Sequence, residues 1–116
     1  MNSEPLTVAE TARRVREREV SPVRLAQSLL DRIEAVDPEV RAWVSIDRQR
    51  VLNEAGAREQ QLEAGSPLGP LHGVPIGVKD IFMTEGQPTG MGSVIFDGHV
   101  PDRDAGAVAK LRRAGA

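Results

Sequence analysis

The chain has 116 residues, with 15 basic and 17 acidic side chains, a net charge of −2 and no cysteine. This balance excludes the net basic, aromatic-rich surface of a nucleic-acid-binding protein, and the lack of cysteine excludes a disulfide framework. No apolar run approaches the roughly 18 residues that a membrane-spanning helix needs, and the N-terminus lacks the basic and apolar regions of a signal peptide. We therefore expect a cytoplasmic protein without nucleic-acid or membrane partners.

The apolar composition limits the core that this chain can build. One Trp, two Phe and no Tyr leave few aromatic side chains, which usually supply much of the buried area of a core. A chain of this length also buries only about two thirds of the surface that it exposes when unfolded. We expect a thin aliphatic core and marginal stability for the isolated chain.

Residues 1–65 are predicted to form a helical lead-in. Thr7–Glu10 (TVAE) has the pattern of a capping box and predicts the start of a first helix. Ser21 followed by Pro22 predicts the N-cap and first turn of a second helix. Apolar residues at helical spacing support this second helix, namely Ala26, Leu29, Leu30, Ile33 and Val36. The Asp37–Pro38 pair predicts its end, because the residue before a proline avoids helical geometry.

Two further elements complete this lead-in. Ala42–Ile46 (AWVSI) is predicted to be a short strand from its apolar and β-branched residues. Asp47 is a suitable N-cap for a third helix, which Gly65 would close.

Residues 66–116 differ in character, because turn-forming residues dominate them. Nine of the eleven glycines and five of the eight prolines fall between Gly65 and Gly106, a density that predicts tight turns around short strands. Val74–Phe82 is predicted to be the main strand, with Gly86–Gly92 as the loop that follows it.

The end of the chain is predicted to be helical. Asp104 is expected to cap a helix over Ala105–Ala114, with Gly115 as its C-cap. A helix, a glycine cap and an abrupt end suggest that a following strand is absent.

Lys79 is the side chain whose chemistry stands out. Thirteen of the fifteen basic residues are Arg, yet a Lys lies in the best predicted strand. Arg stays protonated and cannot act as a base, whereas burial can lower the pKa of a Lys toward neutrality. Strand alternation places Lys79 on the same face as Gly77, which leaves space beside the amine for a ligand or another backbone segment. The alternative is an ordinary Lys that reaches solvent, since Lys is rarely fully buried.

The residues around Lys79 favour the first interpretation. Leu71–Asp80 (LHGVPIGVKD) resembles the lysine motif of the amidase-signature family. Similarity continues downstream and, more loosely, upstream of this motif, through Ser21–Pro22, Asp31–Glu34, Trp43–Val44, Gly86, Pro88–Thr89, Gly92–Ser93, Asp104–Ala105 and Leu111–Ala116. The resemblance therefore covers nearly the whole chain, loosely before Ser66 and closely after it.

This resemblance implies an α/β fold with a central mixed sheet flanked by helices. Residues 1–65 would be its helical lead-in and residues 66–116 the strand–loop–helix start of its core, with the remainder of the domain absent. In this family a nucleophilic Ser attacks an amide carbonyl, and a second Ser with a cis peptide bond relays the proton to the motif lysine. On this match Lys79 is the general base, the substrate is a small-molecule carboxylic amide, and neither a cofactor nor a metal is needed.

The other members of this triad are expected to be missing. None of the six serines lies in a glycine-serine-rich loop of the kind that carries the family's nucleophile and oxyanion hole, so we expect the isolated chain to be inactive. Two alternatives stay open: a noncatalytic remnant that acts as an interaction module, and part of a glutaminase like the A-type subunit of glutamyl-tRNA(Gln) amidotransferase. Trp43, Val44 and Gly90 look more like those of general amidases. A homodimer is also left open.

The loop after the lysine motif is a second candidate region. The resemblance places Thr89, Met91, Gly92 and Ser93 near the lysine and the substrate, as substrate-binding residues. The family often has a second Thr where this chain has Gly90. A glycine-rich turn shaped only by backbone needs is the alternative.

A metal site is a rival to the amidase interpretation. Imidazole and carboxylate groups fall within eight positions, at Asp97, His99, Asp102 and Asp104. Gly98 and Pro101 indicate an ordinary turn, and the ligand types alone do not make a site. We therefore predict no metal.

Overall fold

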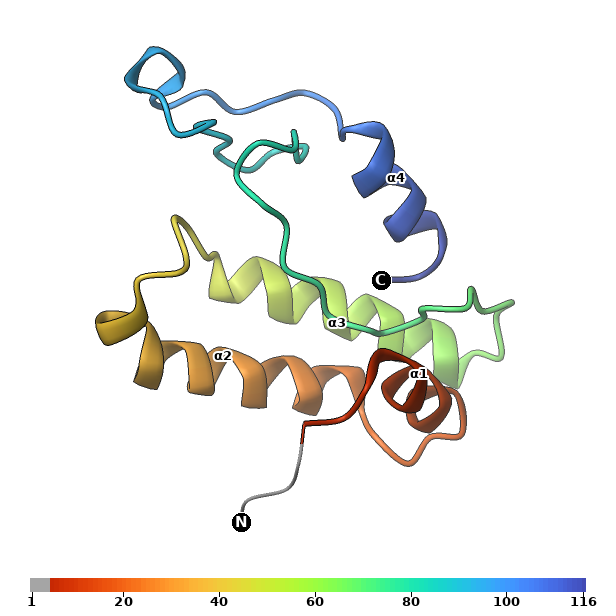
Figure 1. The fold of residues 1–116 in the computed structure, drawn as a ribbon. Coiled ribbons are helices and arrows are strands. Elements are labelled where there is room, and N and C mark those ends of the chain that lie inside the picture. The colour runs from red at the N-terminus through yellow and green to blue at the C-terminus, as the bar shows by residue number, and fades with distance from the viewer. Residues whose placement is uncertain (1–4) are drawn as a thin grey trace.

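The computed structural model describes residues 5–116, and its regular elements are helices (Figure 1). In chain order they are α1 (Val8–Arg16), α2 (Pro22–Val40), α3 (Arg48–Glu63), the short 3-10 helix η1 (Val94–Phe96) and α4 (Gly106–Arg113). Helices α2 and α3 lie side by side and antiparallel. The chain then passes over this pair in an extended segment and continues through a long loop into α4, as Figure 1 shows.

The three helix starts predicted for the lead-in are confirmed. The side-chain oxygens of Thr7, Ser21 and Asp47 each accept a hydrogen bond from the backbone N–H three residues further on. Each bond satisfies one of the N–H groups that the first turn of a helix leaves without an intrahelical partner. Pro22 occupies the first turn of α2, as expected.

The predicted end of α2 at the Asp37–Pro38 pair is wrong. The helix continues through Pro38 to Val40, although a proline inside a helix removes one backbone hydrogen bond. The Asp37 carboxylate instead accepts hydrogen bonds from the backbone N–H groups of Ala42 and Trp43, at 2.7 and 3.2 Å. Asp37 therefore fixes the exit of the chain from α2.

The predicted cap of α4 is also wrong. Its N-cap residue is Ala105, which makes no side-chain capping bond, and the helix begins at Gly106. The Asp104 carboxylate accepts a hydrogen bond from the backbone N–H of Glu85 at 2.8 Å and forms an ion pair with Arg112, 2.9 Å from Nε. Asp104 thus connects α4 to the preceding loop.

Neither predicted strand forms a ladder within residues 5–116. Neither Ala42–Ile46 nor Val74–Phe82 makes the hydrogen bonds of a ladder, and the second segment ends in a turn from Lys79 to Phe82. A strand needs a neighbouring strand for its hydrogen bonds, and the described residues supply none. The mixed sheet accordingly stays a prediction, while these two segments are unpaired here.

The core is thin and aliphatic, as the composition predicts. The buried apolar residues are Ala12, Val15, Ala26, Leu30, Leu62, Val74 and Val108, and no aromatic residue is among them. Trp43, Phe82 and Phe96 are each exposed by about two fifths. The radius of gyration is 14.9 Å, against about 13 Å for a compact domain of this length. Much apolar surface therefore stays uncovered by the described part of the chain.

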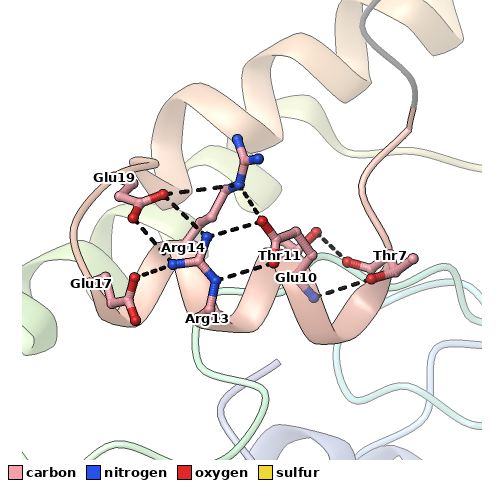
Figure 2. Close-up of polar contacts among 7 residues, drawn as sticks. All are labelled: Thr7, Glu10, Thr11, Arg13, Arg14, Glu17 and Glu19. Atoms are coloured by element: carbon pink, nitrogen blue, oxygen red, sulfur yellow. Dashed lines mark hydrogen bonds and ion pairs between the residues drawn. The ribbon is translucent and has the colours of Figure 1, made fainter.

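A cluster of charged side chains stabilises α1 and the turn after it (Figure 2). Arg13 pairs with Glu10 at 2.9 Å, with Glu17, and with Glu19 at 3.2 Å, while Arg14 pairs with Glu10 at 2.8 Å. The hydrogen bonds donated by Arg13 and Arg14 lower the pKa of Glu10 from about 4.5 to about 2.

We expect Glu10→Gln to weaken the fold in a pH-dependent way. Because the folded pKa lies below the unfolded value, the stabilisation by Glu10 is complete above about pH 4.5 and is lost as the pH falls through about 2. The urea midpoint of Glu10→Gln should thus lie below that of wild type near pH 6, and the gap should largely close near pH 2.5. Glu63→Gln, at the exposed end of α3, is the control. A gap that does not change with pH would contradict the proposed pairing.

Candidate functional site

Lys79 lies in the extended segment that passes over the α2–α3 pair. Its carbonyl accepts a hydrogen bond from the N–H of Phe82 at 3.0 Å, so a turn begins at this residue. Lys79 is exposed, and the described residues do not provide the burial that the sequence led us to expect. A base role for its amine would therefore require further polypeptide to enclose it.

The space beside Gly77 is filled by Trp43. A side chain added at Gly77 would bring its Cβ to 3.1 Å from Cη2 of the indole, closer than most such contacts. The predicted space for a ligand or a backbone is thus occupied by a ring from the segment between α2 and α3. Gly77 is needed here because it lets the lysine segment lie against Trp43.

An apolar groove follows the lysine segment. It has a volume of about 930 Å³ and lies between α2, α3 and the extended backbone. Its lining includes Leu29, Ile33, Trp43, Ile76 and Lys79. The lysine therefore borders a mostly apolar hollow of a size typical of small-molecule sites.

Asp80 connects the lysine segment to the loop that contains the predicted substrate-binding residues. Its Oδ1 accepts a hydrogen bond from the N–H of Gly90 at 2.9 Å, and its carbonyl accepts one from the N–H of Met91, also at 2.9 Å. These contacts link positions ten and eleven residues apart in sequence. The resemblance alone assigned no role to Asp80.

The loop itself is a tight turn over residues 90–93. The N–H of Ser93 donates to the carbonyl of Gly90 at 3.0 Å, and the two central residues, Met91 and Gly92, have φ of 53° and 67°. Positive φ at both central positions is typical of type I′ turns, and it is uncommon for a methionine. The Ser93 hydroxyl accepts a hydrogen bond from the N–H of Ile95 and so begins η1.

The four predicted substrate-binding residues differ in exposure. Thr89 is almost fully buried; its N–H donates to the carbonyl of His99, and its hydroxyl donates to that of Gln87. Met91 and Ser93 are half-buried and Gly92 is exposed. The structure thus brings the loop next to the lysine segment, while the binding role of these residues stays a prediction.

Three arginines that the sequence patterns do not single out hold α3, α4 and residues 85–104 together. Arg50 donates to the carbonyl of Glu85 at 2.7 Å, and Arg112 pairs with Asp104. Arg58 donates to the carbonyls of Arg112 and Ala116 at the end of α4. The partners of Arg50 and Arg58 lie 35 to 58 residues away in sequence, so no local pattern indicates those contacts.

Within residues 5–116, no three His, Asp or Glu side chains are grouped as metal ligands would be. Of the described helices, none combines the length and the apolar character needed to cross a membrane.

Comparison with known proteins identifies the family. The family model described as Amidase matches residues 24–116, which is most of the chain. The chain belongs to the amidase-signature family. The A-type subunits of glutamyl-tRNA(Gln) amidotransferase from Streptomyces coelicolor and Acidothermus cellulolyticus are 44% and 46% identical to it over 94% of the chain. Those matches cover 22% of each relative, so the chain spans about a fifth of the length of these proteins.

Solved structures give the same family. A bacterial aryl acylamidase of the amidase-signature family superposes on 96% of the chain with a TM-score of 0.87 and 25% identity, over 24% of its own length. A chain of a vestigial protein complex, studied for the origins of an s-triazine catabolic enzyme, superposes on 96% with a TM-score of 0.89 and 29% identity, over 24% of its length. The backbone described above is therefore one that amidase-signature proteins adopt.

Proposed function

We propose that this chain supplies the general-base lysine of an amidase-signature enzyme that hydrolyses a carboxylic amide. The observation that carries this proposal is the position of Lys79. It lies within the family match, borders the apolar groove, and is followed directly by the residue that holds the 90–93 turn. A lysine on the border of a groove of small-molecule size is a suitable arrangement for proton transfer to and from a bound amide.

The reaction needs groups that this chain does not contain. A serine hydroxyl would attack the amide carbon and lose its proton, through a second serine in the cis configuration, to the neutral amine of Lys79. The new C–O bond gives a tetrahedral intermediate with the electron pair on the former carbonyl oxygen. The C=O bond then re-forms, the C–N bond breaks, and the proton passes from Lys79 to the departing amine or ammonia. Water would then hydrolyse the acyl-enzyme by the same route. Lys79 can act this way only where its surroundings disfavour the ammonium form, which requires enclosure by the rest of such an enzyme.

A more specific candidate is the amide of glutamine. The named relatives with 37–46% identity are A-type subunits of glutamyl-tRNA(Gln) amidotransferase, whereas the amidase structures share 25–32%. These identities support a glutaminase-type substrate over the general amidase suggested by Trp43, Val44 and Gly90.

The proposal can be tested in a chimaeric enzyme in which this chain replaces the 109-residue matching segment of the Streptomyces coelicolor relative. We expect the chimaeric enzyme to release ammonia from glutamine faster than it releases aniline from an acylanilide. The 116-residue chain alone should release neither product above the buffer rate. A folded chimaeric enzyme that hydrolyses neither amide would contradict the proposed function, and faster acylanilide cleavage would favour the general amidase.

A further inference from the structure

We propose that Asp80 is a positioning residue, which holds the 90–93 turn at a fixed place beside Lys79 and so sets how tightly the amide substrate is bound. This inference rests on the proposed function. Asp80 contributes two acceptors from one residue: its side-chain Oδ1 and its main-chain oxygen receive the successive N–H groups of Gly90 and Met91, each at 2.9 Å. Because Asp80 directly follows Lys79, the turn is attached one residue away from the proposed base.

The turn needs such an attachment. Met91 has a φ of 53°, which is uncommon for a side chain of its size, and surrounding contacts must maintain it. On its other side the loop is held by the bond from the N–H of Thr89 to the carbonyl of His99 at 2.9 Å. Among the described residues, the Asp80 contacts are the bonds that join this turn to the lysine segment.

Gly90 allows the carboxylate to approach this closely. A Cβ at Gly90 would lie 3.2 Å from Oδ2 of Asp80, a tight contact that would press on the carboxylate. The glycine therefore leaves the N–H of residue 90 accessible to Asp80. Removal of the carboxylate should free the turn without displacing any apolar core residue.

The experiment compares Asp80→Ala, Asp80→Asn and Asp102→Ala in the chimaeric enzyme. Asn keeps an oxygen that can accept the Gly90 N–H, whereas Ala removes it. We expect KM for glutamine to rise about tenfold in Asp80→Ala with kcat reduced less than about threefold, while Asp80→Asn stays within about threefold of wild type in both. Asp102, which is fully exposed in the same loop region, is the control and should change neither constant.

Three outcomes would overturn the inference. An unchanged KM with a lower kcat in Asp80→Ala would indicate fewer folded molecules and a merely structural residue. If KM rose as much in Asp80→Asn as in Asp80→Ala, substrate binding would depend on the negative charge of Asp80 and not on its hydrogen bond to Gly90. If Asp80→Ala had the same KM and kcat as wild type, the contacts between Asp80 and the turn would have no effect on substrate binding. Lys79→Ala is measured in parallel, since full activity of that variant would contradict the proposed function instead.

A second measurement needs no turnover. In the 116-residue chain, amide hydrogen exchange at Gly90 should be slow in wild type and Asp80→Asn and about tenfold faster in Asp80→Ala. Equal exchange rates in all three proteins would overturn the attachment itself, whatever the chimaeric enzyme does.

Discussion

Lys79→Arg is expected to inactivate the chimaeric enzyme nearly as completely as Lys79→Ala. A cation at this position could assist amide hydrolysis as a fixed positive charge, or it could give up its proton and act as a base. Arg keeps the first property and lacks the second, because its pKa stays above about 12 in proteins. General-base catalysis typically contributes about 100- to 10,000-fold in rate, so both variants should lose at least about 100-fold in kcat/KM.

The measurement is kcat/KM for glutamine in wild type and both variants, after circular dichroism has shown that each is folded. The larger guanidinium also has to fit near Gly77 and Trp43, so a folded Lys79→Arg protein is essential for the comparison. If Arg retained more than about a tenth of wild-type activity, Lys79 would act by charge or by structure and not as a base.

Gly69→Ala is expected to cause the largest loss of stability of any single methyl addition in this chain. An added Cβ would lie 2.2 Å from the carbonyl oxygen of Ala114 and 2.5 Å from its carbonyl carbon, both of them backbone atoms. That same oxygen accepts the N–H of Leu71 at 2.8 Å, which holds the end of α4 against the lysine motif. The backbone would have to separate there, at a cost of about 3 kcal/mol.

Gly56→Ala is the matched control for this substitution. Gly56 lies inside α3 and has nothing within 4 Å of an added Cβ, so Ala should stabilise the helix by up to about 1 kcal/mol. Urea unfolding of wild type, Gly69→Ala and Gly56→Ala gives the change in the free energy of unfolding for each variant. If the free energy of unfolding of Gly69→Ala lay within about 0.5 kcal/mol of the wild-type value, α4 would not be held against Gly69.

Features determined by neighbouring residues could be predicted from the sequence. The caps at Thr7, Ser21 and Asp47 depend on groups three residues apart, and all three formed. Composition likewise anticipated a core without aromatic residues, because so few aromatic side chains were available to fill it.

Features that depend on distant partners could not be predicted in this way. Asp104 looked like a helix cap because Asp is common there, yet its carboxylate meets Glu85 and Arg112. The sequence predicts a strand over Val74–Phe82, but a strand also needs a neighbouring strand, and the described residues form none. The same limit applies to the candidate site. The motif points to Lys79, whereas the contact between Asp80 and Gly90 joins residues ten positions apart and no local pattern indicates it.

Participation of Lys79 in amide hydrolysis can be tested directly, because the chain offers its own control. Lys79 and Lys110 are its two lysines, and both are exposed in the structure. The direct measurement is kcat/KM of the chimaeric enzyme on glutamine with Lys79→Ala or Lys110→Ala. We predict a loss of at least about 100-fold for Lys79→Ala, with Lys110→Ala within about twofold of wild type. A Lys79→Ala enzyme as active as Lys110→Ala would contradict a catalytic role for Lys79.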